Sequence, residues 1–171
     1  DLYGLGLQAD TQRVYPEGTL AAQVLGFVNY DGEGQYGVEQ YYNDELSGTP
    51  GVLQTITDVS KIPLTIGAKD ISIPAEDGTD LVLSIDRNIQ AQAEQVLADG
   101  LKNAQATSGS MVVMDPQTGR VLAMANLPSY DPANYGDVES ASVYQNNVIS
   151  NAYEPGSVMK LFTVGTGLDT G

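Results

Sequence analysis

The stretch Y-E-P-G-S-V-M-K-L-F-T, residues 153–163, combines a break in the chain with the start of a helix. Pro155 and Gly156 interrupt the segment before it, and a helical pattern follows them. Its apolar residues recur at helical spacing, so we expect one buried face. That face consists of Val158, Leu161, Phe162 and Val164. Ser157 and Lys160 then share the opposite side of the first turn.

The spacing of Ser157 and Lys160 suits a nucleophile and its base, because residues three apart are neighbours on a helix. A serine hydroxyl needs a base to take its proton, and a lysine can serve when desolvation and nearby positive charge favour its neutral form. The helix start supplies positive charge, and the free Ser157 amide can face an oxyanion. The alternative is structural: a serine that opens a helix and a solvated surface lysine.

Residues 153–163 resemble the nucleophile segment of class B penicillin-binding proteins, the D,D-transpeptidases that cross-link peptidoglycan. Further segments resemble the same family in its own order and cover nearly the whole chain, which makes the series more specific than S-x-x-K alone. These segments are R-V-Y-P at 13–16, G-Q-Y-G-V-E at 34–39, L-S-G at 46–48 with Gly51, L-S-I-D-R-N-I-Q at 83–90 with Ala93 and Glu94, residues 108–125, and P-S-Y-D-P at 128–132. One departure is Q-N-N-V-I-S at 145–150, where relatives commonly have an Asn-Arg pair.

The resemblance implies an α+β fold in two parts. Residues 1–78 are expected to form part of a mixed pedestal or dimerisation module. Residues 79–171 are expected to form the N-terminal part of a transpeptidase domain, an antiparallel sheet with flanking helices. The polar segment 75–78 is the expected boundary.

The resemblance also implies a chemistry, in which Ser157 attacks a stem peptide ending in D-Ala-D-Ala with Lys160 as base, and β-lactams imitate that peptide. Neither a metal nor an organic cofactor is implied. The G-V-E segment at 37–39 looks closer to the septal, cell-division branch than to the elongation branch. A membrane glycan polymerase and division proteins are the partners expected by analogy. A β-lactam-hydrolysing or β-lactam-sensing relative, and a scaffold without chemistry, are the alternatives.

Composition narrows the chemistry further. The chain has 171 residues and a formal net charge of -15, which argues against binding nucleic acid. It contains no cysteine and no histidine, so thiol catalysis, disulfides, Ser-His-Asp chemistry and histidine-based metal sites are excluded. No apolar run is long enough to span a membrane. The resemblance places relatives on the outer side of the cytoplasmic membrane, held by an anchor that we expect to precede this chain.

In the first unit we expect a helix from about Leu20 to Phe27 or Val28 with Thr19 as N-cap, a turn over 29–34 and a helix over 38–46 ending near Gly48. Strands are expected at 52–57, 62–66 and 71–73. Arg13 and Glu39 are expected to pair and to lock their two segments together.

In the second unit we expect a strand over 81–85, a long helix capped by Asp86 and a hairpin over 108–125 with Gly119 at positive φ. The helix has a core stripe of Ile89, Ala93, Val96, Leu97, Leu101 and Ala104. The apolar strand 121–125 is expected to be covered on both faces. Asp115 is read as a turn residue, and one short helix is expected around 139–144. For Tyr130, Tyr135 and Tyr144 we expect a packing role in preference to contact with a substrate groove.

The relatives' second and third active-site motifs, Ser-x-Asn and Lys-Thr-Gly, do not occur after Lys160 in this sequence. We therefore expect the 171 residues alone to be catalytically inactive, because an oxyanion donor would be missing. We also expect either the rest of the domain or self-association to complete the sheet, because its edges would otherwise be bare.

Overall fold

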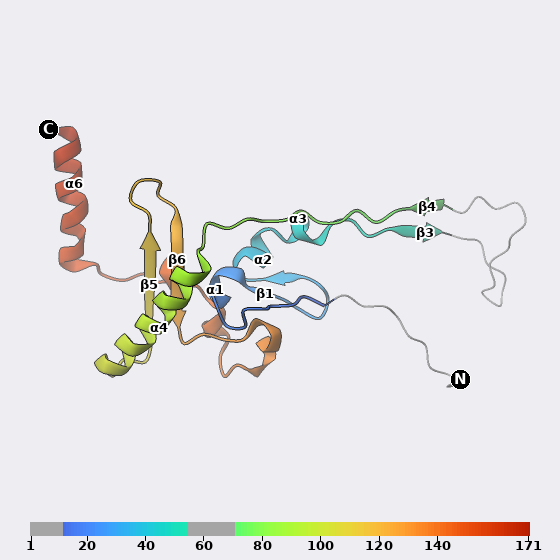
Figure 1. The fold of residues 1–171 in the computed structure, drawn as a ribbon, viewed down its shortest axis with the longest axis horizontal. Coiled ribbons are helices and arrows are strands. Elements are labelled where there is room, and N and C mark those ends of the chain that lie inside the picture. The colour runs from blue at the N-terminus through green and yellow to red at the C-terminus, as the bar shows by residue number, and fades with distance from the viewer. Residues whose placement is uncertain (1–11, 55–70) are drawn as a thin grey trace, which may run out of the picture.

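The structure is a computed structural model that describes residues 12–54 and 71–171. Figure 1 shows a central group of short elements, a narrow two-stranded arm reaching away from it, and a C-terminal helix standing apart. The last three residues of the strand expected at 52–57, and the whole strand expected at 62–66, lie outside the described residues. The remaining elements combine helices with three small antiparallel sheets of two strands each among the described residues.

The first elements are shorter than the sequence pattern predicts. Helix α1 (Ala22–Leu25) ends at Gly26, whose φ is 83°. The expected continuation to Phe27 or Val28 is wrong, because those residues form β1 (Phe27–Val28) and pair with β2 (Gly34–Gln35). Thr19 is not the N-cap either, because Ala21 occupies that position. The turn expected over 29–34 is confirmed, and it joins these two strands.

The expected helix over 38–46 is present in two pieces, α2 (Gly37–Tyr41) and α3 (Asn43–Ser47). They are separated at Tyr42, which has a φ of -109°. The end at Gly48 is as predicted, with a φ of 64°. The α2 helix carries Glu39, which is buried.

The arm in Figure 1 consists of β3 (Val52–Gln54) and β4 (Ile71–Ile73), which pair in antiparallel register. The pairing continues toward the centre of the molecule through a bridge between Thr49 and Glu76. Segment 75–78, expected to be a polar link, therefore runs beside the chain that follows α3.

The expected strand over 81–85 is wrong, because this segment forms no regular ladder. Ser84 Oγ donates to the Val121 carbonyl at 2.7 Å, and the Asp86 amide donates to the Leu122 carbonyl at 2.8 Å. These bonds hold the segment beside the hairpin, while Val82 remains 97% exposed. The next residues start α4 (Arg87–Ala104), and Asp86 caps it as predicted, accepting bonds from Asn88 N and Ile89 N.

Helix α4 lies across the hairpin of β5 (Gly109–Met114) and β6 (Val121–Leu127), as Figure 1 shows. Their shared core contains Ala93, Leu97, Ala123 and Ala125, so small side chains on both elements allow close packing. Val96, which is 58% exposed, and Ala104, which is exposed as well, depart from the expected stripe. Burial of a side chain such as Leu97 stabilises the fold by about 2 kcal/mol.

The hairpin turn is as predicted, with Gly119 at a φ of 73°. Asp115 is a turn residue, since its carboxylate accepts bonds from Gln117 N and Thr118 Oγ1. The cover expected on both faces of 121–125 agrees with the structure, because every residue of that stretch is buried or half-buried. On the neighbouring strand β5, by contrast, Val112 and Met114 remain 41% and 53% exposed.

A buried glutamine joins α4 to the edge of β6. Gln90 is fully buried, its Nε2 donates to the Met124 carbonyl at 3.1 Å, and its Oε1 accepts from the Met124 amide at 2.7 Å. Its Nε2 also donates to Glu94 Oε1, which in turn accepts from the Ala21 amide. This chain of bonds fixes α1 against the helix-hairpin unit.

A second core is aromatic and combines residues from both expected units. Phe27 stacks on Tyr135 with ring centroids 4.3 Å apart, and Tyr130 meets Phe27 edge-on at 6.1 Å. Tyr36 and Tyr144 complete the cluster. The expected packing role of Tyr130, Tyr135 and Tyr144 is therefore confirmed.

Candidate active site

The segment before the candidate site contains three short helices, where one was expected. They are η1 (Pro132–Asp137), η2 (Ala141–Tyr144) and α5 (Asn147–Ser150). Each begins after a side chain that accepts a bond from the backbone: Asp131, Ser140 and Asn146, respectively. Such caps satisfy amides that a helix leaves free at its start.

The helix expected at residue 157 is present. It starts as η3 (Gly156–Met159) and continues as α6 (Lys160–Thr170). Gly156 has a φ of 55°, and the Val158 amide makes the first bond, to the Pro155 carbonyl at 3.2 Å. The chain therefore turns sharply into the helix. The amide of Ser157 comes one residue before the first amide that bonds within the helix.

Ser157 and Lys160 lie on one turn, because the Lys160 amide donates to the Ser157 carbonyl. Both side chains are exposed, and among the described residues no hydrogen bond joins the hydroxyl to the amine. Neither Ser157 nor Lys160 lies in the wall of any of four well-formed cavities on the described part of the chain. The two roles assigned to these residues stay predictions.

The expected burial of the helix face is wrong for the described residues. Val158, Leu161, Phe162 and Val164 are 56%, 74%, 68% and 60% exposed. Figure 1 shows the reason: α6 stands away from α4 and from the hairpin, so no described element covers its apolar side.

Two asparagines hold the segment leading to Ser157; Asn146 lies in the run that departs from the family pattern, but the sequence analysis assigned neither asparagine a role. Asn126 on β6 is 3% exposed, and its Nδ2 donates to Asn146 Oδ1 at 2.9 Å. Asn126 Oδ1 accepts from Ser110 Oγ on β5 at 2.9 Å. Asn146 Oδ1 also accepts from the Val148 amide, which caps α5. The hairpin thus fixes α5 shortly before the helix that carries Ser157.

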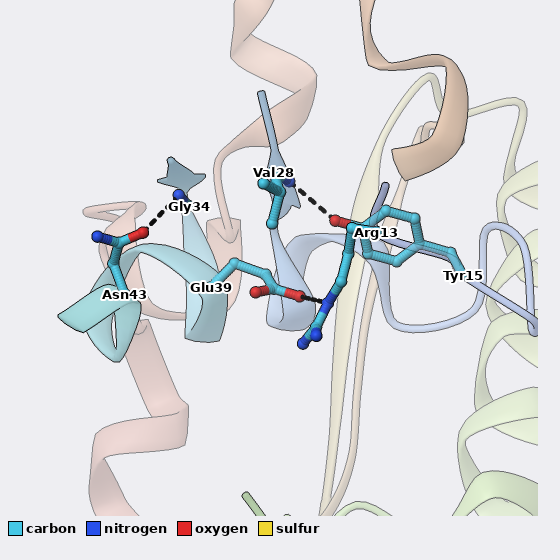
Figure 2. A network of polar contacts seen from close by, with 6 residues as sticks. All are labelled: Arg13, Tyr15, Val28, Gly34, Glu39 and Asn43. Carbon is cyan, nitrogen blue, oxygen red and sulfur yellow. Dashed lines mark hydrogen bonds and ion pairs between the residues drawn. The ribbon is translucent and has the colours of Figure 1, made fainter. Parts of the chain in front are cut away.

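The predicted pair of Arg13 and Glu39 is confirmed, as Figure 2 shows. Arg13 Nε donates to Glu39 Oε1 at 2.8 Å, and the two side chains are 48% and 9% exposed. Nearby, Tyr15 Oη accepts from the Val28 amide at 2.8 Å. Burial is the main cause that raises the pKa of Tyr15 above its ordinary value. These contacts tie the segment before α1 to α2 and β1.

Comparison with known proteins identifies both parts of the chain. The family model "Penicillin-binding Protein dimerisation domain" matches residues 1–83, and "Penicillin binding protein transpeptidase domain" matches residues 109–171.

Relatives and solved structures agree with these matches. The chain is 35% identical to Stage V sporulation protein D of Bacillus subtilis, over 99% of this chain and 26% of that protein. It is 37% identical to Peptidoglycan D,D-transpeptidase FtsI of Escherichia coli K12, over 99% of this chain and 28% of that protein. The crystal structure of Penicillin Binding Protein 2X from Streptococcus thermophilus matches 88% of this chain and 23% of that one, with a TM-score of 0.70 and 27% identity. The chain therefore spans about a quarter of the length of these relatives, and it belongs to the class B penicillin-binding proteins.

Proposed function

We propose that this chain is part of a serine D,D-transpeptidase that cross-links peptidoglycan stem peptides. The observation that carries the proposal is the placement of Ser157 and Lys160 on the first turn of a helix, within the residues that match the transpeptidase family model. Residues 1–78 serve as the pedestal and residues 79–171 contribute to the catalytic domain. The names of the relatives, FtsI and Stage V sporulation protein D, favour the division branch.

In the proposed reaction, Ser157 Oγ bonds to the carbonyl carbon of the penultimate D-alanine, and its proton passes to the neutral Lys160 amine. The peptide C–N bond breaks, and the terminal D-alanine leaves as its nitrogen takes that proton. An amine from a neighbouring strand then attacks the acyl-serine, gives up a proton and restores the Ser157 hydroxyl. β-Lactams enter at the first step and leave a stable acyl-serine.

The proposed place of action is the cell envelope, where peptidoglycan is built. A membrane glycan polymerase and division proteins are its proposed partners, and the remainder of the catalytic domain or a second copy is proposed to cover the apolar side of α6. Among the described residues, no helix combines the length and the apolar character needed to cross a membrane.

Acylation by a fluorescent penicillin tests the proposal, in the longest natural protein that contains this chain. Ser157→Ala is expected to abolish labelling, and Lys160→Met to slow it by about a hundredfold or more, as loss of a positioned base does. Ser108→Ala and Lys102→Met are matched controls, because both are exposed residues outside the candidate site.

Labelling that survives Ser157→Ala would refute the assigned nucleophile. A label that forms at Ser157 and is then rapidly hydrolysed would favour a β-lactam-hydrolysing relative. No labelling of the wild-type protein would leave a scaffold role in its place.

A further inference from the structure

A cavity of about 570 Å³ opens between the segment before α1, the turn joining β1 to β2, and η1. It lies far along the chain from Ser157, and the proposed reaction does not use it. Its volume falls in the range of about 300–1,000 Å³ that is typical of ligand sites. Three tyrosines line it, Tyr15, Tyr30 and Tyr135, together with Arg13.

Tyr30 is 96% exposed, yet the turn that carries it is well organised. Asn29 Oδ1 accepts bonds from the amides of Asp31 and Glu33, at 3.0 and 2.9 Å. The Asn29 backbone bonds to Glu33 and Gly32 as well. The turn therefore presents the Tyr30 ring to solvent from a fixed backbone, which lowers the ordering cost of binding.

The ring of Tyr30 is one of two aromatic walls set at an angle. Its centroid lies 5.5 Å from that of Tyr135, with 52° between the ring planes. Tyr135 is half-buried and stacks on Phe27 in the aromatic core. The Tyr135 ring is thus held in the core, whereas the Tyr30 ring is exposed. A flat apolar face of a ligand can pack on the exposed ring.

Polar groups lie beside these rings. Arg13 uses Nε to bond Glu39, and Figure 2 shows the other two guanidinium nitrogens turned away from that carboxylate. Tyr15 Oη accepts from Val28 and keeps its own proton to donate. Asp31 also lines the cavity, and Glu39 outside it pairs with Arg13, so the two carboxylates exceed the one positive charge by a single negative charge. The site therefore suits a neutral ligand rich in hydroxyl and amide groups more than a strongly charged one.

We propose that this cavity binds the glycan part of peptidoglycan, with an N-acetylated amino-sugar ring packed on Tyr30. The C–H face of a pyranose is flat and apolar, whereas its rim carries hydroxyl and acetamido groups. The rings of Tyr30 and Tyr135 match the face, and Arg13 and Tyr15 offer donors to the rim. The choice of glycan rests on the proposed function in peptidoglycan synthesis, whereas the chemistry of the cavity stands on its residues.

Binding of soluble glycan strands without stem peptides tests the inference, by calorimetry on the longest natural protein that contains this chain. Tyr30→Ala is expected to weaken binding about two- to tenfold, because the aromatic contact with the ligand is lost. Tyr30→Phe keeps the ring and is expected to keep most of the affinity. Tyr41→Ala is the matched control, because Tyr41 is 79% exposed and does not line this cavity.

The inference is overturned if Tyr30→Ala binds the strands as wild type does, if Tyr41→Ala loses the same affinity, or if isolated stem peptides bind through Tyr30 in place of the strands. Penicillin labelling separates this result from the proposed function. A protein that is labelled at Ser157 but does not bind the strands refutes the glycan site alone. One that binds them through Tyr30 but resists labelling refutes the transpeptidase proposal alone.

Discussion

The hydroxyl of Tyr130 donates a hydrogen bond of 3.0 Å to the backbone carbonyl of Ala22, across 108 residues of chain. Both residues are buried, and the Tyr130 ring also meets Phe27 and Tyr144 edge-on. The loop after β6 thus completes the core of the first elements. A boundary near residue 78 stays a prediction, and it would divide two units that share this core.

Tyr130→Phe is expected to cost about 1 kcal/mol in the free energy of unfolding, because the Ala22 carbonyl loses its buried partner while the ring packing remains. Urea denaturation at neutral pH measures this loss. Tyr30→Phe is the control, since its ring is exposed and its hydroxyl is open to water. Equal unfolding free energies for the two variants would contradict a structural role for the Tyr130 bond.

The stability of the protein is also expected to fall in alkali. Burial, and then the neighbouring tyrosines, raise the pKa of Tyr130 well above its ordinary value of 10.0. Above pH 10 the unfolded chain loses this proton while the folded protein keeps it, so the unfolding free energy decreases as pH rises. Tyr130→Phe removes that proton, and its urea midpoint is expected to fall less steeply between pH 9 and about 11.5. An unchanged slope would show that other groups cause the alkaline loss.

The elements that the sequence predicted well are those set by local chemistry. Asp86 caps α4 because its carboxylate reaches amides two and three residues ahead. The turn from Asp115 to Gly119 is likewise fixed by neighbours in sequence. The predicted pair of Arg13 and Glu39 came from the family resemblance, since no local rule relates residues 26 positions apart.

The elements that were predicted wrongly depend on distant contacts. The helical pattern after Ala22 stops at Gly26, where an added Cβ would lie 2.2 Å from the Tyr36 carbonyl oxygen. Gln90 looks like a solvated helix residue, yet it is fully buried because Met124 offers it two backbone groups. For the candidate site, Ser157 and Lys160 were visible as a motif. Asn126 and Asn146 were not, because their bond requires β6 to meet a loop twenty residues later.

Two glycines of one hairpin are expected to respond differently to alanine. An added Cβ at Gly34 would lie 2.0 Å from the Glu39 carbonyl oxygen, so the backbone must shift and Gly34→Ala is expected to cost about 3 kcal/mol or more. Gly32 has open space around it and a φ of 82°, so Gly32→Ala is expected to cost only about 1–2 kcal/mol of backbone strain. Chemical denaturation compares the two variants. Similar losses would contradict the close approach of β2 to α2.

Thr118→Val is expected to raise the pKa of Asp115. The Thr118 hydroxyl, and then the Gln117 amide, stabilise the carboxylate and hold its pKa below the ordinary 3.8. A group of this kind stabilises the fold above its unfolded pKa, and that contribution is lost as pH falls through the folded value. The variant is therefore expected to lose less stability on acidification. NMR titration of the Asp115 carboxyl measures the shift, and an unmoved pKa would refute the assigned cause.

The bond between Asn126 and Asn146 predicts an asymmetry between two conservative changes. Asn126→Asp removes the buried donor and sets a carboxylate against Asn146 Oδ1, which is expected to cost about 2–3 kcal/mol. Asn146→Asp keeps both acceptor roles, toward Asn126 and the Val148 amide, and loses only a contact to Met124 Sδ. It is expected to cost less than about 1 kcal/mol.

Denaturation and penicillin labelling together measure this asymmetry. Because α5 lies shortly before Ser157, Asn126→Asp is also expected to slow labelling in protein that remains folded, while Asn146→Asp labels at nearly the wild-type rate. Asn151→Asp is the matched control, since Asn151 is exposed beyond the end of α5. Equal losses of stability in the 126 and 146 variants would contradict the donor and acceptor roles assigned here. Unchanged labelling in both would show that the hairpin does not position the nucleophile through α5.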